Sequence, residues 1–157
     1  TGEVEGFVLF SYSFVNRLQS ITPDFMGKFE KLKGNLKVGD VIKVELTLRA
    51  TVDMSFVHLR DHKAASFEHR DQTSNYVYSL WWRHDRSVVP HYYQPHDTHI
   101  DFFIENLAKG ENKLSYEATV TNAGDISAGF AEVQCTFTPE LVAKSAGSRI
   151  VISNIIK

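Results

Sequence analysis

The sequence contains a single cysteine, Cys135, and only four prolines in 157 residues. One cysteine excludes an internal disulfide and a zinc site built from several cysteines, although an oxidising compartment does not oblige a protein to use disulfides. The longest apolar runs, at 7–10 and 150–152, fall far short of the roughly 20 residues that a membrane helix needs. We therefore expect no membrane contact by this chain, and the cysteine count leaves its compartment open.

The sequence also lacks an excess of positive or negative charge. The 17 basic and 19 acidic residues give a formal net charge of −2. The basic residues form no stripe of the kind that binds a phosphate backbone. This excludes nucleic acid as an expected partner.

The chain is instead rich in aromatic residues, with eleven Phe, six Tyr and two Trp among 43% hydrophobic residues. This composition is typical of a globular protein with much β-structure. A chain of 157 residues fits one ordinary domain, which buries roughly 70% of the surface that the unfolded chain exposes. No segment keeps a helical period for three turns.

Three segments alternate apolar and polar residues with the period of two that marks a half-buried strand. They are Val41–Ala50, 114–120 and 131–137. In the third segment the inward set would be Ala131, Val133, Cys135 and Phe137, and Pro139 would end the strand. Weaker strands are expected at 6–15, 54–59, 76–82, 99–105 and 149–153.

Turn residues separate these strands, at 37–40, 108–111 and 122–125, each with a glycine. About eight short strands at roughly even spacing predict an all-β fold, an antiparallel β-sandwich in which two sheets bury one face each against the other. We expect one domain over 1–157, with an N-terminal strand and turn at 1–23, an exposed connection at 24–36 and the sandwich proper at 37–153. Because Thr1 follows no initiator methionine or signal segment, we expect a processed product or a part of a longer protein.

Histidines are the sharpest local anomaly, because four of the seven lie between His84 and His99. The pair His96 and His99 is compatible with a metal clip on a turn. Their spacing matches no strong zinc pattern, such as His-Glu-x-x-His on a helix. The favoured interpretation is a solvated polar loop, with no metal and no cofactor; the alternative is a metal-dependent enzyme built on this loop.

Nucleophilic catalysis finds little support. The sequence has no Gly-x-Ser-x-Gly motif that would present a serine beside a base. The strand pattern places Cys135 among apolar neighbours, where a thiol is inert. We expect a structural cysteine and no enzyme activity.

Neighbouring aromatic pairs, Trp81-Trp82 and Tyr92-Tyr93, suggest a second alternative. Such rings can stack on a sugar, and adjacent strand residues point to opposite faces, so that one ring of each pair can stay exposed. A free-standing ligand-binding β-sandwich, such as a carbohydrate-binding module using Trp82 and Tyr92, is therefore the alternative function.

Two long blocks of the sequence, 36–68 and 101–152, resemble the C-terminal region of bacterial alpha-2-macroglobulins. The start, at 10–23, is similar to that family's aromatic strand and Ile-Thr-Pro turn, so the resemblance covers nearly the whole chain. Most matching positions are turn or core residues, which indicates fold and lineage and no active site. The landmarks, in order, are Val38-Gly39-Asp40, Phe102-Phe103, Lys109-Gly110, Ala123-Gly124-Asp125, Gln134-Cys135 and Pro139-Glu140.

The resemblance implies a macroglobulin-like β-sandwich, immunoglobulin-like in its two-sheet architecture, at the end of a large extracytoplasmic protein of the periplasm or cell envelope. Such a parent, membrane-anchored or secreted, traps proteases after a bait segment is cut, which makes it an endopeptidase inhibitor. The implied partners are the neighbouring domains and, through the parent, target proteases. The family's Cys-Gly-Glu-Gln thioester is absent, and Cys135 stands in a different context.

The segment 79–99 departs from the family pattern, in which a Gly-rich stretch precedes Tyr-Tyr-Gln. We expect a feature specific to this chain there, and we name it a candidate interaction loop. Its candidate residues are Trp82, His84, Tyr92 and His96.

Overall fold

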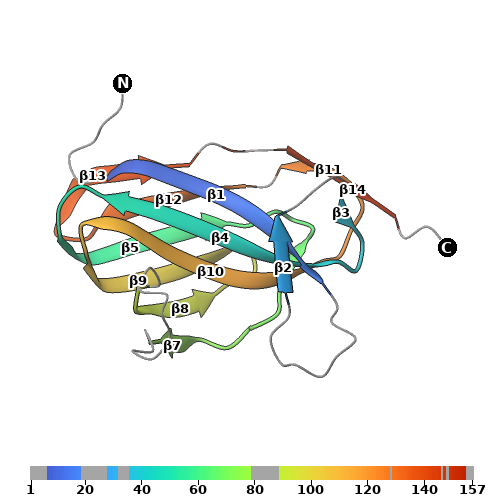
Figure 1. Ribbon diagram of the computed structural model, residues 1–157, viewed down its shortest axis with the longest axis horizontal. Coiled ribbons are helices and arrows are strands. Elements are labelled where there is room, and N and C mark those ends of the chain that lie inside the picture. The colour runs from blue at the N-terminus through green and yellow to red at the C-terminus, as the bar shows by residue number, and fades with distance from the viewer. Residues whose placement is uncertain are drawn as a thin grey trace.

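The computed structural model describes residues 7–18, 28–31, 36–78, 89–127, 129–145, 147 and 149–154. Every regular element in these ranges is a β-strand, and the strands form three sheets (Figure 1). Within the same ranges, no helix is long and apolar enough to cross a membrane. The predicted all-β fold is confirmed.

The first layer is a five-stranded antiparallel sheet with the long strands β4 and β10 near its centre. Both alternate strictly, so that Ile42, Val44 and Leu46 are fully buried on one side. Their register opposes Leu46 to Leu114, which the same alternation places on the buried face. The strands, in sheet order, are β2 (Lys28–Lys31), β1 (Phe7–Leu18), β4 (Val41–Ala50), β10 (Gly110–Val120) and β6 (Phe67–His69).

The second layer is a six-stranded antiparallel sheet that carries the site described below. Its inward residues, among them Leu59, Ile100 and Phe102, are fully buried. The strands, in sheet order, are β13 (Thr138–Lys144), β12 (Phe130–Cys135), β5 (Met54–His62), β9 (His99–Leu107), β8 (His91–Pro95) and β7 (Asn75–Val77).

A third, small sheet joins β11 (Gly124–Ser127), β14 (Arg149–Ser153) and β3 (Leu36–Lys37) at one end of the molecule (Figure 1). The pairing of β14 with β3 is parallel, unlike the other strand pairs of the described chain. Arg149 clamps Asp125 across this sheet with two hydrogen bonds, of 3.1 and 2.7 Å.

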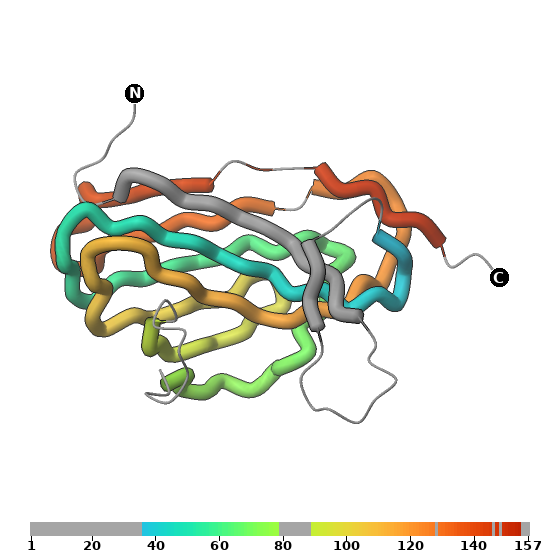
Figure 2. Tube along the Cα trace, in the orientation of Figure 1, coloured from blue at the N-terminus to red at the C-terminus, as the bar shows by residue number. Residues whose placement is uncertain are grey.

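The two large sheets lie face to face and enclose one apolar core (Figures 1 and 2). In Figure 2 the cyan β4 and orange β10 belong to the near layer, and the green β5 and yellow β9 to the far layer. The core takes residues from both inner faces, as expected when each sheet has only one apolar side. The predicted β-sandwich is therefore confirmed.

The turn before β4 shows why this strand begins where it does. Gly39 has φ of 93°, a conformation that glycine adopts without steric cost. Asp40 N donates to Lys37 O at 3.1 Å, and Lys37 N donates to Asp40 Oδ2 at 2.9 Å. The predicted turn at 37–40 is present and leads directly into the strand.

The prediction for 131–137 is right at its start and wrong at its end. Ala131, Val133 and Cys135 are buried, but Phe137 is 74% exposed because the chain turns after Cys135. Pro139 does not end a strand; it lies inside β13, which sits at the edge of its sheet. An edge strand accommodates proline because one row of its N–H groups has no partner strand.

The segment 24–36, expected to be an exposed connection, contains β2 and the first residue of β3. Leu36 is fully buried, since β3 pairs with β14 and places this side chain in the core.

Candidate functional site: the outer face of the six-stranded sheet

The register between β5 and β9 decides which residues reach the outer face of the six-stranded sheet. It opposes His62 to His99, Arg60 to Asp101 and His58 to Phe103. Because side chains alternate along a strand, these residues project away from the core, while the residues between them point inward. Residues from distant parts of the sequence thus meet on one surface.

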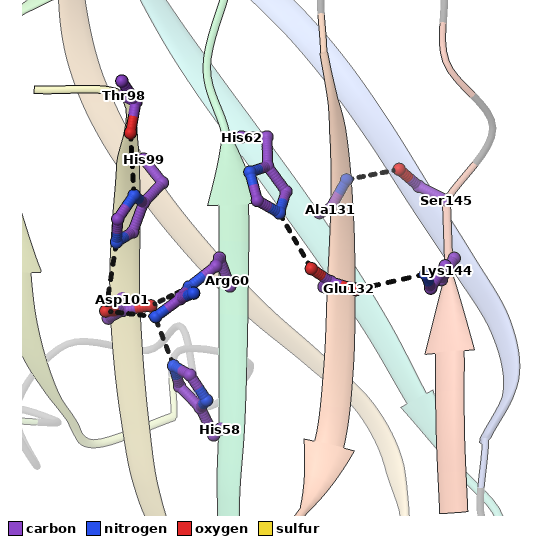
Figure 3. Close-up of polar contacts among 10 residues, drawn as sticks. All are labelled: His58, Arg60, His62, Thr98, His99, Asp101, Ala131, Glu132, Lys144 and Ser145. Atoms are coloured by element: carbon purple, nitrogen blue, oxygen red, sulfur yellow. Dashed lines mark hydrogen bonds and ion pairs between the residues drawn. The ribbon is translucent and has the colours of Figure 1, made fainter. Parts of the chain in front are cut away.

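Asp101 is the centre of a polar group on this face. Arg60 Nε donates to Asp101 Oδ1 at 2.8 Å and Arg60 Nη2 donates to Oδ2 at 3.1 Å. His58 Nε2 donates to Oδ1 at 2.8 Å (Figure 3). Burial alone would raise the pKa of Asp101, but the hydrogen bonds from Arg60 and His58 lower it to about 2. The carboxylate is therefore ionised and held in a fixed orientation.

Two further histidines approach the other side of the same carboxylate. His96 Nε2 and His99 Nε2 lie 3.4 and 3.5 Å from Asp101 Oδ2. Their rings are stacked, with centroids 4.5 Å apart. Burial, together with the charge of Arg60, lowers the pKa of His99. We call these five residues, His58, Arg60, His96, His99 and Asp101, the Asp101 cluster.

A second carboxylate, Glu132 on β12, continues this polar row toward the sheet edge. His62 Nε2 donates to Glu132 Oε1 at 2.8 Å, and Lys144 Nζ lies 3.3 Å from Oε2 (Figure 3). The hydrogen bond from His62 lowers the pKa of Glu132, and Lys144 adds to this effect. Charges of alternating sign, from Lys144, Glu132, Arg60 and Asp101, therefore cross four neighbouring strands.

Exposed aromatic rings lie beside this polar row. They line a hollow of about 270 Å³, together with Val57, Ile104, Glu105 and Thr136. His58 stacks on Phe103 with centroids 4.8 Å apart and so connects the rings to the Asp101 cluster. We call this group the aromatic patch: Phe56, Tyr76, Tyr92, Phe103 and Phe137.

Phe56 is held in an unusual backbone conformation within the patch. Its φ is 55°, in the left-handed region that bulky side chains rarely adopt. The ring is nevertheless 49% exposed and meets Phe137 edge to face, with centroids 5.1 Å apart. A strained backbone that presents an apolar ring to solvent is typical of a functional surface.

The residues of the predicted interaction loop are divided by the structure. Tyr92 belongs to the aromatic patch and His96 to the Asp101 cluster. Trp82 and His84 lie outside the described residues. Sequence analysis missed His58, Arg60 and Asp101, although the alternation of β5 continues past Leu59 to His62 and would have placed His58 and Arg60 on one face.

The predicted burial of Cys135 is confirmed, at 6% exposure. Its Sγ donates a hydrogen bond of 3.5 Å to Ser55 O.

The two-layered antiparallel architecture defines a β-sandwich domain. Consistent with this, a family model described as the Bacterial Alpha-2-macroglobulin MG10 domain matches residues 17–140. The chain belongs to the bacterial alpha-2-macroglobulin MG10 domain family. A search of the curated proteins gives no match.

Solved structures of bacterial alpha-2-macroglobulins share the fold. The Y1175G mutant of the Salmonella protein matches with a TM-score of 0.64 and 14% identity, over 92% of this chain and 9% of its own. The Escherichia coli protein activated by porcine elastase matches with a TM-score of 0.64 and 14% identity, over 91% of this chain and 13% of its own. The native Escherichia coli protein from domain MG7 to the C-terminus matches with a TM-score of 0.63 and 14% identity, over 97% of this chain and 24% of its own. The chain thus spans less than a quarter of the length of these structures.

Proposed function

We propose that this chain is a non-catalytic structural and interaction domain of a large extracytoplasmic alpha-2-macroglobulin, and that the whole protein traps proteases. The observation that carries the proposal is the aromatic patch on the outer face of the six-stranded sheet. The family membership supplies the context, because the solved relatives are several times longer than this chain.

The patch has the chemistry of a contact between domains. Phe56, Phe103 and Phe137 are each more than a third exposed, although burying a phenylalanine side chain contributes about 1.5–3 kcal/mol. Aromatic residues are enriched at protein interfaces, and contiguous exposed apolar patches mark them. We infer that a neighbouring domain of the same polypeptide covers these rings.

The alternating charges beside the patch would fix the orientation of that neighbour. Partly exposed charges contribute little to affinity, yet they penalise a wrongly placed partner by bringing like charges together. The apolar rings would supply the affinity for the neighbouring domain. The charged row from Lys144 to Asp101 would set the orientation of that domain, so that one docking geometry is favoured.

Protease trapping is proposed for the parent by analogy with its relatives. The Escherichia coli relative was solved after activation by porcine elastase, and the Salmonella relative after reaction with methylamine. A trap that encloses a protease needs domains that pack together and move together. A sandwich domain with exposed aromatic rings on its outer face suits that task.

The first test is the reading frame on either side of this chain. The proposal expects further sandwich domains in the same polypeptide, with a secretion or lipoprotein signal at its start. A frame that encodes this domain alone would contradict it.

The second test is hydroxyl-radical footprinting of Phe56, Phe103 and Phe137, in the 157-residue chain and in the complete polypeptide. The proposal expects these rings to be oxidised in the isolated chain and protected in the complete protein. Val151 on β14 is a matched exposed apolar residue outside the patch. Equal oxidation of the three rings in both forms would contradict the proposed contact.

A further inference from the structure

The histidines around Asp101 approach its carboxylate at two different distances. On Oδ1, Arg60 Nε and His58 Nε2 both lie at 2.8 Å, which is the length of a charge-assisted hydrogen bond. On the other oxygen, Oδ2, His96 Nε2 and His99 Nε2 remain at 3.4 and 3.5 Å. The histidines on Oδ2 are thus too far for strong hydrogen bonds.

This longer spacing fits ligands that share a metal ion. Zinc bonds of about 2.0–2.1 Å in a tetrahedral site place two ligand atoms roughly 3.3–3.4 Å apart. Both nitrogen-to-oxygen distances are close to that value, and the three ligand atoms all lie within 4.8 Å of one another.

We propose that His96 Nε2, His99 Nε2 and Asp101 Oδ2 bind a divalent transition-metal ion, with zinc as the representative of its class. Two imidazoles and one carboxylate suit zinc, copper or nickel. Calcium and magnesium prefer sites made of oxygen ligands. The His96 side chain is 40% exposed, so water from the solvent reaches the site and would complete the coordination of the ion.

The turn between β8 and β9 sets the ligands in place. His96 N donates to His99 O at 2.8 Å, which closes the turn and brings the two rings together. His69, at 6% exposure, has its Nε2 3.0 Å from His96 O and anchors the same turn from inside.

Contacts behind the ligands hold them in the orientation that binding requires. Thr98 Oγ1 lies 3.0 Å from His99 Nδ1, which leaves Nε2 directed at Asp101 (Figure 3). With an ion on Nε2, Nδ1 would carry the proton and donate to the threonine. Such outer contacts fix the tautomer of a ligating histidine and the orientation of a ligating carboxylate.

Arg60 is compatible with the ion although it carries a positive charge. Its Nη2 occupies one lone pair of Asp101 Oδ2 at 3.1 Å, and a carboxylate oxygen offers two. The second lone pair would bind the ion.

The test is calorimetric titration of the 157-residue chain with zinc chloride after removal of metals by a chelator. We expect one ion per chain, and no binding of magnesium or calcium at the same concentrations. In His96→Gln, on an exposed turn that leaves the core intact, zinc affinity should fall by more than the roughly 10- to 100-fold that loss of an outer contact costs. In Thr98→Val, which removes only an outer contact, the loss of zinc affinity should stay within that range.

The matched control is His62→Gln. His62 lies on the same face, but its Nε2 is engaged with Glu132 at 2.8 Å. Its zinc affinity should stay within about twofold of the original, because no ligand is removed. Absence of zinc binding, or an equal loss in His62→Gln and His96→Gln, would overturn the proposal. Cobalt provides a second readout, since a four-coordinate site absorbs strongly in the visible range and His99→Gln should abolish that band.

Discussion

Tyr116 Oη donates a hydrogen bond of 2.5 Å to Asp61 Oδ2, and this contact connects the two layers of the sandwich. Tyr116 belongs to β10 in the five-stranded sheet, and Asp61 to β5 in the six-stranded sheet. Both residues are buried, and Asp61 is the only inward-facing acidic residue among the described part of β5. A buried polar pair of this kind fixes how the two sheets lie against each other.

Tyr116→Phe should lower the free energy of unfolding by about 1–3 kcal/mol, because Asp61 loses a donor inside the core while the ring keeps its packing. Urea unfolding followed by circular dichroism measures this. Tyr92→Phe is the control, since this ring lies on the outer face and its change should stay within about 0.5 kcal/mol. Similar losses in both variants would show that the hydrogen bond does not stabilise the sandwich.

Acid should destabilise the fold through His91. Burial lowers the pKa of this residue below its ordinary value of 6.5, despite the contact of Nδ1 with Val89 O at 2.8 Å. In acid the unfolded chain therefore binds a proton that the folded chain does not. The contribution of His91 to stability is fully present above about pH 6.5 and is lost as the pH falls below that value.

His91→Gln should show a smaller loss of stability between about pH 7.5 and about pH 5.5 than the original chain, by at most about 1.4 kcal/mol. Urea unfolding of both proteins at the two pH values gives the difference. Parallel losses would mean that His91 does not contribute to the acid sensitivity.

Gly129 should tolerate no side chain. Its φ is 79°, and a Cβ there would lie 1.7 Å from His62 O. Gly129→Ala should destabilise the fold by more than about 3 kcal/mol, since the backbone between β11 and β12 must move. Gly39→Ala is the control that distinguishes backbone conformation from a steric clash. Its φ is also positive, but a Cβ added there would have no atom within 4 Å. It should cost only about 1–2 kcal/mol, and equal costs in thermal unfolding would refute the steric explanation.

Cys135 should react slowly with an aromatic disulfide reagent in the native chain and at once in denaturant. The thiol is buried, and thiol reactivity requires access and a thiolate. Absorbance of the released thiolate measures both rates. Rapid reaction under native conditions would mean that the end of β12 opens readily.

Sequence patterns predicted the central strands well because local chemistry decides them. Val41–Ala50 alternates strictly between a glycine-containing turn and a second turn, and the structure gives β4 the same bounds. The prediction for Phe137 was wrong because a turn without glycine or proline at its centre leaves little trace in the sequence. The edge strand β13 was missed for a related reason. A proline usually ends a strand, but Pro139 lies inside this one.

The candidate site was harder to predict because it depends on contacts between distant residues. Asp101 meets Arg60 and His58 across 41 and 43 positions of sequence. That meeting requires the register of β5 against β9, which no local pattern specifies. The density of histidines did direct attention to His96, whose partners became visible only in the folded chain.

The proposed contact role is tested most directly by the complete polypeptide with the substitutions Phe56→Ser and Phe137→Ser together, against Val151→Ser as the control. The measurement is the residual activity of elastase, after incubation with each protein, on a large protein substrate and on a small peptide. We predict that the original protein and the control block cleavage of the large substrate and spare that of the small one, while the double variant blocks neither. Equal inhibition by all three proteins, or none by the original, would contradict the account.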